Sequence, residues 1–377
     1  MIVLEYIFWI SALLIVYVYV GYPLVLMILI PKANSLIKQE IIPNVILFIP
    51  AYNEEKVIMN KIENSLALDY PKEKLKIVVA SDGSTDSTEI IVKDYVDKGI
   101  ILFESKIRKG KSFIINEFIP KSDGDIIIFT DANCVYKEDS IKKLVRSFND
   151  EKVGCVVGNL KYIDKRSSVG KGEGLYFRYE SMIKKLESRY GAVVAANGSI
   201  YAIRKDLFSS LDPDVANDLA HPIKIAYKRY KIVFEPEAIA YEKATSSPTE
   251  EFGRRSRIVT RGLTAFIRYW KKYHMLKGMW GFCFISHKLI RWFVPFFLIA
   301  ILLSNFFLYS QFYKFTLYSQ LVFYFISFIE VFLNGRLGKF FSVPFYFFLI
   351  NLAALVGILR YFKGKREAIW DKAESTR

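Results

Sequence analysis

Cysteine and histidine are scarce in this 377-residue chain, with three of each. The cysteines, Cys134, Cys155 and Cys283, form no Cys-x-x-Cys pair, so we expect reduced thiols rather than a disulfide framework or a zinc site. Three scattered histidines are too few for a histidine-built metal site. A Gly-x-Gly-x-x-Gly turn is also missing after the first apolar run of the polar region, which argues against a dinucleotide-binding oxidoreductase.

Acidic residues are also under-represented, with 38 Asp and Glu against 53 Lys and Arg, and the net charge is +15. This imbalance indicates nucleic acid, anionic lipid or a phosphorylated substrate as a partner. However, 52% of the residues are hydrophobic and the mean hydropathy is +0.21, which is unusual for a soluble enzyme. We therefore expect membrane lipids among the partners and no nucleic acid.

Long apolar runs lie near both ends of the chain. Residues 2–30 carry one charge, Glu5, and exceed the roughly 20 residues that cross a bilayer. No basic stretch precedes this run and no small-x-small cleavage site follows it, so a retained anchor is favoured over a cleaved signal peptide. Three further membrane segments are expected at 289–308, 317–333 and 341–359, with buried core helices as the alternative.

The stretch from Phe252 to Arg291 contains ten Lys or Arg residues and no acidic residue. By the positive-inside rule this flank faces the cytoplasm, which predicts a multi-pass protein of the cell membrane with a cytoplasmic polar domain. Four crossings would place the basic tail outside, whereas its charges favour the inside, so one C-terminal segment is expected to be re-entrant or interfacial. The expected units are an anchor (1–31), a polar domain (40–245), amphipathic interfacial helices (246–284), transmembrane helices (285–362) and a basic tail (363–377).

Short apolar runs alternate with helical periodicity in the polar domain. Continuous apolar runs are typical of strands covered on both faces, and the intervening segments repeat apolar residues at helical spacing. This alternation predicts an α/β fold with a mainly parallel sheet. The expected strands are 44–49, 75–80, 100–103 and 126–129, and the expected helices are 54–68 and 84–95.

Polar clusters follow three of these strands. Pro50-Ala51-Tyr52-Asn53-Glu54 follows the first, Ser81-Asp82-Gly83 the second, and Thr130-Asp131-Ala132-Asn133 the fourth. In such sheets ligands bind beyond the carboxyl ends of the strands. The three clusters are therefore expected at one edge of one sheet.

These motifs, in this order and spacing, resemble those of the family 2 glycosyltransferases, the inverting GT-A group that includes cellulose, chitin, hyaluronan and poly-N-acetylglucosamine synthases. The resemblance covers residues 44–262 and implies a Rossmann-like GT-A domain and a nucleotide-sugar donor. The family makes a UDP-sugar the expected donor. It implies Mg²⁺ or Mn²⁺ as cofactor, because a hard cation on oxygen ligands compensates the diphosphate charge. The implied donor-side residues are Pro50, Ala51, Tyr52 and Glu54 at the nucleotide pocket, Asp82 at the base or ribose, Lys111 near the diphosphate, and Asp131 with Asn133 at the metal.

The same resemblance implies the acceptor side. Asp218 is implied as the general base, and an ordinary helix N-cap is the alternative role for this Asp. Asn197 and Gly198 match a segment that lines the acceptor. The implied diphosphate contacts are Arg254 and Arg257, on an amphipathic helix with aromatic residues opposite a basic stripe, as at a membrane surface. Ile258 stands where processive synthases carry a tryptophan.

The sequence thus predicts a membrane-bound inverting glycosyltransferase, a hexosyl- or N-acetylhexosaminyltransferase, that extends a polysaccharide at the membrane. Two alternatives remain open. One is transfer of a single sugar to a membrane lipid, either a polyprenyl phosphate or a glycolipid. The other is a non-catalytic membrane transporter subunit or receptor with a degenerate nucleotide domain.

Overall fold

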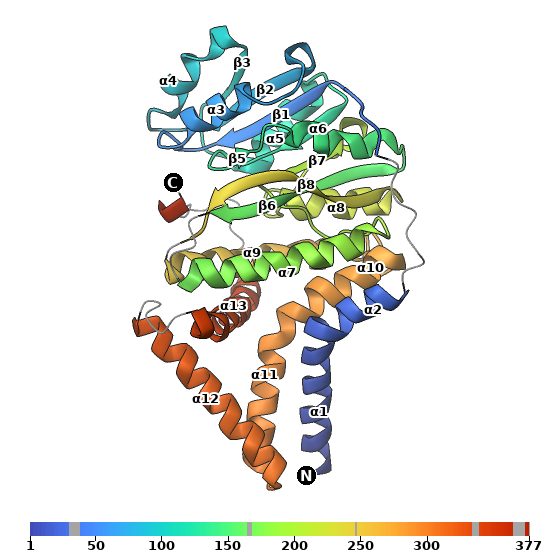
Figure 1. The fold of residues 1–377 in the computed structure, drawn as a ribbon, viewed down its shortest axis with the longest axis vertical. Helices are drawn as coiled ribbons and strands as arrows, with labels where there is room; N and C mark the ends of the chain where they lie inside the picture. Colours follow the sequence, from blue (N-terminus) through green and yellow to red (C-terminus); the bar gives the residue numbers. More distant parts are fainter. Residues whose placement is uncertain (30–37, 164–167, 246, 334–338, 365–373, 377) are drawn as a thin grey trace.

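The computed structural model describes residues 1–29, 38–163, 168–245, 247–333, 339–364 and 374–376. Within these residues the polar domain is built on one sheet of eight strands in the order β3-β2-β1-β4-β7-β6-β8-β5 (Figure 1). The strands are β1 (Val45–Ala51), β2 (Leu75–Asp82), β3 (Ile100–Ser105), β4 (Ile126–Phe129), β5 (Val135–Tyr136), β6 (Val153–Ile163), β7 (Tyr201–Arg204) and β8 (Lys231–Lys243).

The first four strands confirm the expected parallel sheet. β1 pairs in parallel with β2 and β4, and β2 pairs in parallel with β3. The apolar runs of β1 and β4 are buried on both faces, as continuous rather than alternating hydrophobicity predicts, whereas the edge strand β3 is partly exposed. The connecting helices are α3 (Ile58–Leu66), α4 (Thr88–Lys93), α5 (Lys111–Phe118) and α6 (Ser140–Val145).

The other half of the sheet is mixed, which the sequence pattern did not indicate. β7 lies antiparallel to both β4 and β6, while β6 and β8 pair in parallel. Because β7 runs opposite to β4, its first residue, Tyr201, pairs with Phe129 at the end of β4. The loop before β7 is thereby brought to the same edge as the polar clusters.

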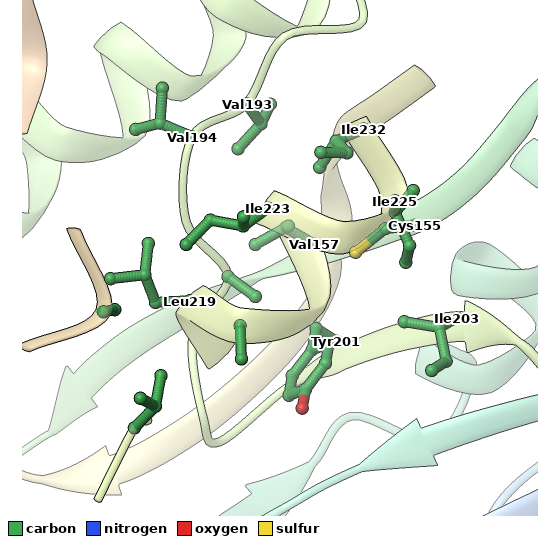
Figure 2. Close-up of a cluster of buried hydrophobic side chains, with 14 of the residues drawn as sticks. Cys155, Val157, Val193, Val194, Tyr201, Ile203, Leu219, Ile223, Ile225 and Ile232 are labelled. Atoms are coloured by element: carbon green, nitrogen blue, oxygen red, sulfur yellow. The ribbon is translucent and has the colours of Figure 1, made fainter. Parts of the chain in front are cut away.

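Three helices cover one face of this half-sheet: α7 (Ser168–Ser188), α8 (Asn217–Tyr227) and α9 (Pro248–Tyr269). Figure 2 shows the apolar face of α8, with Leu219, Ile223 and Ile225, over side chains of β6 and β7. This packing is dense, because Ile223, Ile225 and their strand neighbours Val157 and Ile203 are almost completely buried. It fixes the start of α8 relative to the sheet edge.

Apolar helices form the rest of the molecule. Three described helical stretches are long and apolar enough to cross a membrane: Ile2–Leu29, Gly278–Phe307 and Phe341–Phe362. The first comprises α1 (Ile2–Val16), a π-helical turn (Tyr17–Gly21) and α2 (Tyr22–Leu29). The second comprises α10 (Gly278–Phe284), another π-helical turn (Ile285–Leu289) and α11 (Ile290–Phe307), so the expected boundary between 284 and 285 falls inside one continuous helix.

The remaining two helices are α12 (Gln311–Leu333), which covers the expected segment at 317–333 but is not among these three, and α13 (Lys339–Phe362). Figure 1 shows α1, α11 and α12 extending away from the sheet, whereas α13 lies close to α9 and packs against it and α7. Glu374, which follows α13 in the chain, pairs with Lys56 at 3.3 Å, and the backbone amide of Ser375 donates to Glu250. These contacts place the short turn Glu374–Thr376 against the polar domain.

Glycines let α9 approach both of its membrane-side neighbours very closely. A Cβ on Gly262 would lie 2.6 Å from a ring carbon of Trp292 in α11. A Cβ on Gly357 of α13 would lie 2.6 Å from the carbonyl oxygen of Ser256 in α9. The hydroxyl of Thr260 also donates to the Gly357 carbonyl at 2.8 Å. α9 therefore packs directly against the Trp292 ring of α11 and against the backbone of α13 at these points.

Candidate active site

A cavity of about 470 Å³ lies at the carboxyl ends of β1, β2 and β4 and extends to α9, α11 and α13. This volume falls within the range of small-molecule sites. Every residue that the sequence assigned to the site lines it: Pro50, Ala51, Tyr52, Glu54, Asp82, Lys111, Asp131, Asn133, Asn197, Gly198, Asp218, Arg254, Arg257 and Ile258.

Asp131 lies directly after β4 and pairs with Lys111, the first residue of α5, at 2.8 Å. Burial alone would raise the pKa of Asp131, but the Lys111 ammonium and a hydrogen bond from Ser199 hold it below its usual value. The buried Lys61 anchors the turn that carries Asp131, because its ammonium donates to the Thr130 hydroxyl at 2.9 Å. Asp131 is thus a positioned, ionised carboxylate.

Asp218 lies in the first turn of α8, and the cap position belongs to Ala216 with no side-chain capping bond. The Asp218 side chain therefore does not cap α8, which excludes the N-cap alternative. Gly198 lies between the two carboxylates, because its Cβ position would be 3.4 Å from Asp131 Oδ2 and 3.8 Å from Asp218 Oδ2. Burial raises the pKa of Asp218, and the positive charges of Lys111 and Arg261 oppose that rise. A raised pKa suits a group that must accept a proton.

Asp82 at the end of β2 holds a basic turn in place. Its two carboxylate oxygens accept the backbone N–H groups of Lys109 and Gly110, both at 2.8 Å. Burial raises the pKa of Asp82, and these two bonds oppose the rise. The turn presents the Arg108 guanidinium over the Tyr52 ring, 3.8 Å from its centroid. This stacked pair is a flat, positively charged wall of the cavity.

The expected metal position contains a residue that the sequence reasoning missed. Glu242 in β8 is buried, accepts from the Asn133 amide at 3.2 Å and from the Ser199 hydroxyl at 3.0 Å. Burial raises its pKa to about 7, with Arg254 opposing and the Asp131 charge reinforcing the shift. No group of three or more His, Cys, Asp or Glu side chains in the described ranges could hold a metal by itself. Carboxylate and amide oxygens nevertheless fit Mg²⁺ or Mn²⁺, which such sites bind through one or two carboxylates together with substrate phosphates.

The two arginines expected at the diphosphate differ in their surroundings. Arg254 donates to Glu251 at 2.8 Å, to the Tyr162 hydroxyl at 2.9 Å, and to Glu173. Both carboxylates are buried, so the charge of Arg254 is already matched within α7 and α9. Arg257, one helical turn further along α9, also lines the cavity.

Several other cationic side chains line the cavity on its membrane side: Lys184, Arg261, Lys288 and Arg291. The sequence showed a basic flank here, but nothing in its pattern indicated which of these residues face a common space. Burial lowers the pKa of Lys184 to about 8, and its ammonium donates to Asn197 at 2.5 Å.

Comparison with known proteins agrees with this geometry. The model of the family described as Glycosyl transferase family 2 matches residues 46–215. The probable glycosyltransferase YdaM of Bacillus subtilis is 28% identical over 262 residues, which cover 66% of this chain and 61% of that protein. The poly-beta-1,6-N-acetyl-D-glucosamine synthase of Staphylococcus aureus is 29% identical over 197 residues, 50% of this chain and 47% of the synthase. The chain therefore spans less than two thirds of each of these relatives.

Among solved structures, the mannosyltransferase PcManGT from Pyrobaculum calidifontis, in complex with GDP-Man and Mn²⁺, has a TM-score of 0.72 at 19% identity. The superposition covers 96% of this chain and 99% of that one, so the two chains share their fold over almost their whole length.

Proposed function

We propose that this chain, whose residues 46–215 belong to glycosyl transferase family 2, transfers a sugar with inversion from a nucleotide-sugar donor to an acceptor held at the membrane. The observation that carries the proposal is the pair of carboxylates, Asp131 and Asp218, on either side of Gly198. One is kept ionised by Lys111, and the other has a raised pKa. Environments that push the pKa values of two carboxylates apart are typical of sites in which one carboxylate stays charged and the other exchanges a proton.

The residues define a single displacement. Asp218 accepts the proton of the acceptor hydroxyl while that oxygen forms a bond to the anomeric carbon of the donor sugar. The bond from this carbon to the diphosphate breaks, and its electron pair leaves with the nucleotide diphosphate. Lys111 and Arg257, which both line the cavity, would stabilise the charge that develops on the leaving diphosphate.

Asp131 and Asn133 would hold the divalent ion, with Glu242 directly beside them. When bound, Mg²⁺ or Mn²⁺ supplies Lewis-acid compensation of the diphosphate charge. Pro50, Ala51, Tyr52 and Glu54 form the nucleotide side of the cavity, where Arg108 offers its stacked guanidinium.

The acceptor that we propose is a growing polysaccharide, with a hexose or N-acetylhexosamine as the transferred unit and UDP as the nucleotide. Its hydroxyl would enter past Asn197, Gly198 and Ile258. Transfer of one sugar to a membrane lipid is the second candidate. Two observations support this second candidate. Ile258 replaces the tryptophan of processive synthases, and the cavity reaches Trp292 and Ile350 of the membrane-side helices.

The test is nucleotide release by the detergent-purified full-length protein across a panel of UDP- and GDP-sugars, with Asp218→Asn as control. We expect metal-dependent release from one donor, reduced about 10²- to 10⁴-fold in the variant. A polymer ladder on a gel identifies the synthase, and a single lipid-soluble product identifies the lipid transferase. Failure of every donor to release nucleotide, with membrane lipids added, would instead favour a non-catalytic membrane protein.

A further inference from the structure

Glu242 is a buried carboxylate to which the proposed displacement gives no role. It lies in β8, is 9% exposed and lines the cavity. The antiparallel pairing of β5 with β8 sets Tyr241 opposite Val135, which brings the next residue of β8 beside the turn that follows β4. Glu242 therefore reaches the metal side of the cavity from a different strand than Asp131 and Asn133.

Hydrogen bonds connect Glu242 to both residues expected at the metal. Its Oε1 accepts from the Asn133 side-chain amide at 3.2 Å, and its Oε2 lies 3.0 Å from the Ser199 hydroxyl, which also lies 3.2 Å from Asp131 Oδ2. A hydroxyl carries one hydrogen, so Ser199 can donate to only one of the two carboxylates at a time. The other close contact between oxygens is repulsive unless a proton or a cation offsets it.

Glu242 forms no ion pair with any residue that the structure describes. The positive charge of Arg254 acts on it from a distance, but the guanidinium hydrogen bonds to Glu251 and Glu173. The negative charges of Asp131 and Glu173 act on Glu242 in the opposite direction. A buried carboxylate without a paired cation is costly, so Glu242 requires either a proton or a cation as its counterpart.

Asp131 on its own is a weak site for a divalent cation. Lys111 pairs with it at 2.8 Å, and the buried Lys61 adds a second positive charge close by. Asn133 can contribute an amide oxygen, which carries no charge. Because the affinity of oxygen sites for hard cations depends on the number of charged ligands, this side of the cavity requires a second carboxylate.

We propose that Glu242 supplies the second carboxylate of the divalent-metal site, in place of the second aspartate that the family usually carries at position 133. The inference rests on the proposed function, because it completes the ligands for the Mg²⁺ or Mn²⁺ that accompanies the donor diphosphate. The negative charge has moved from the turn after β4 to β8, where the sequence motif does not show it. Because the Ser199 hydroxyl contacts both Asp131 and Glu242, the two carboxylates act as one unit.

The experiment measures Mn²⁺ binding by the full-length protein in detergent, from the electron paramagnetic resonance signal of the free ion, with and without UDP. Glu242→Gln keeps an oxygen that can accept from Asn133 but removes the charge. We expect it to weaken Mn²⁺ binding by about tenfold or more, because one charged ligand is lost. Glu237→Gln removes an exposed carboxylate from the same strand outside the cavity, so it is the matched control and should bind like the wild type.

A double-mutant cycle separates the charge of Glu242 from its other effects. Asn133→Asp alone should change the Mn²⁺ affinity by less than about threefold, because the new carboxylate would face Glu242, which already supplies the second charge. In the Glu242→Gln background the same change should raise the affinity about tenfold, to near the wild-type value. A gain of about tenfold from Asn133→Asp alone would overturn the inference, and this result can be obtained even if Glu242→Gln does not fold.

An unchanged Mn²⁺ affinity in Glu242→Gln would show that a proton rather than a cation lies on this carboxylate, and would also overturn the inference. A wild-type protein that binds no Mn²⁺, with or without UDP, would have the same consequence. Nucleotide release is measured in parallel. Mn²⁺ binding in the expected pattern without release from any donor contradicts the proposed function alone, and release with unchanged Mn²⁺ binding in Glu242→Gln contradicts this inference alone.

Discussion

Substitution of Gly198 by alanine is a sharp test of the geometry, because it should separate stability from activity. Gly198 lies in the turn before β7, and its backbone is not in the left-handed region, so alanine can adopt it without strain. The added Cβ would lie 3.4 Å from Asp131 Oδ2 and 3.8 Å from Asp218 Oδ2, which are ordinary contact distances. Nothing in the fold must move to accommodate it.

The expected effects of this substitution on stability and on activity have opposite signs. A glycine-to-alanine change at a compatible position stabilises a protein by about 0.4–1 kcal/mol, since the unfolded chain loses freedom. The methyl group, however, would occupy space between the base and the metal-side carboxylate, where the acceptor hydroxyl and the anomeric carbon must meet. A displacement of reacting groups by about 1 Å costs on the order of 10²-fold in rate. We therefore expect an unchanged or raised melting temperature and a roughly hundredfold lower kcat/KM for nucleotide release.

Gly253→Ala is the matched control. Gly253 lies in α9 with open space around its Cβ position, so alanine there should add about 1 kcal/mol of helix stability and leave the rate unchanged. Wild-type activity in Gly198→Ala would refute the placement of the reaction between the two carboxylates. A large fall in its melting temperature would refute the packing on which the reasoning depends.

Two further outcomes are expected. Lys111→Met should lower kcat/KM for the donor about 10²-fold, because it removes the cation proposed to stabilise the leaving diphosphate, and steady-state release assays measure this. Arg254→Met should cost about 3 kcal/mol of stability in thermal unfolding, because it leaves the buried Glu173 and Glu251 carboxylates short of a partner, and a variant as stable as wild type would contradict that role.

Much of the donor side could be predicted from the sequence because it is encoded locally. Each buried strand is a continuous apolar run, and the polar residues at its carboxyl end follow within a few positions, as with Asp82 and Asp131. Parallel pairing then brings these ends together without any further information. The proposed general base, Asp218, could be identified only through the family resemblance, since an Asp before a helix is equally a cap.

The missed residues reach the site through tertiary packing. Glu242 is 109 positions from Asn133 in the sequence, and the antiparallel pairing of β5 with β8 brings the two together. Arg254 pairs with the buried carboxylates Glu173 and Glu251, a role that nothing in the sequence pattern indicates. The apolar composition of α13 predicts a crossing segment, whereas its packing on α9 is set by shape at Gly357.

The close glycine contacts of α9 would make the proposed sugar transfer sensitive to the bilayer. Gly262 packs against Trp292 of α11, and Gly357 of α13 packs against Ser256 of α9, so little space separates α9 from these neighbours. If α11 spans the membrane, acyl chains shorter or longer than its hydrophobic length would change its tilt. The change would be transmitted through these contacts to Arg257 and Arg261, which line the cavity from α9. Membrane thickness, set by the acyl chain length of the host lipids, would then be a variable that tunes the proposed transfer.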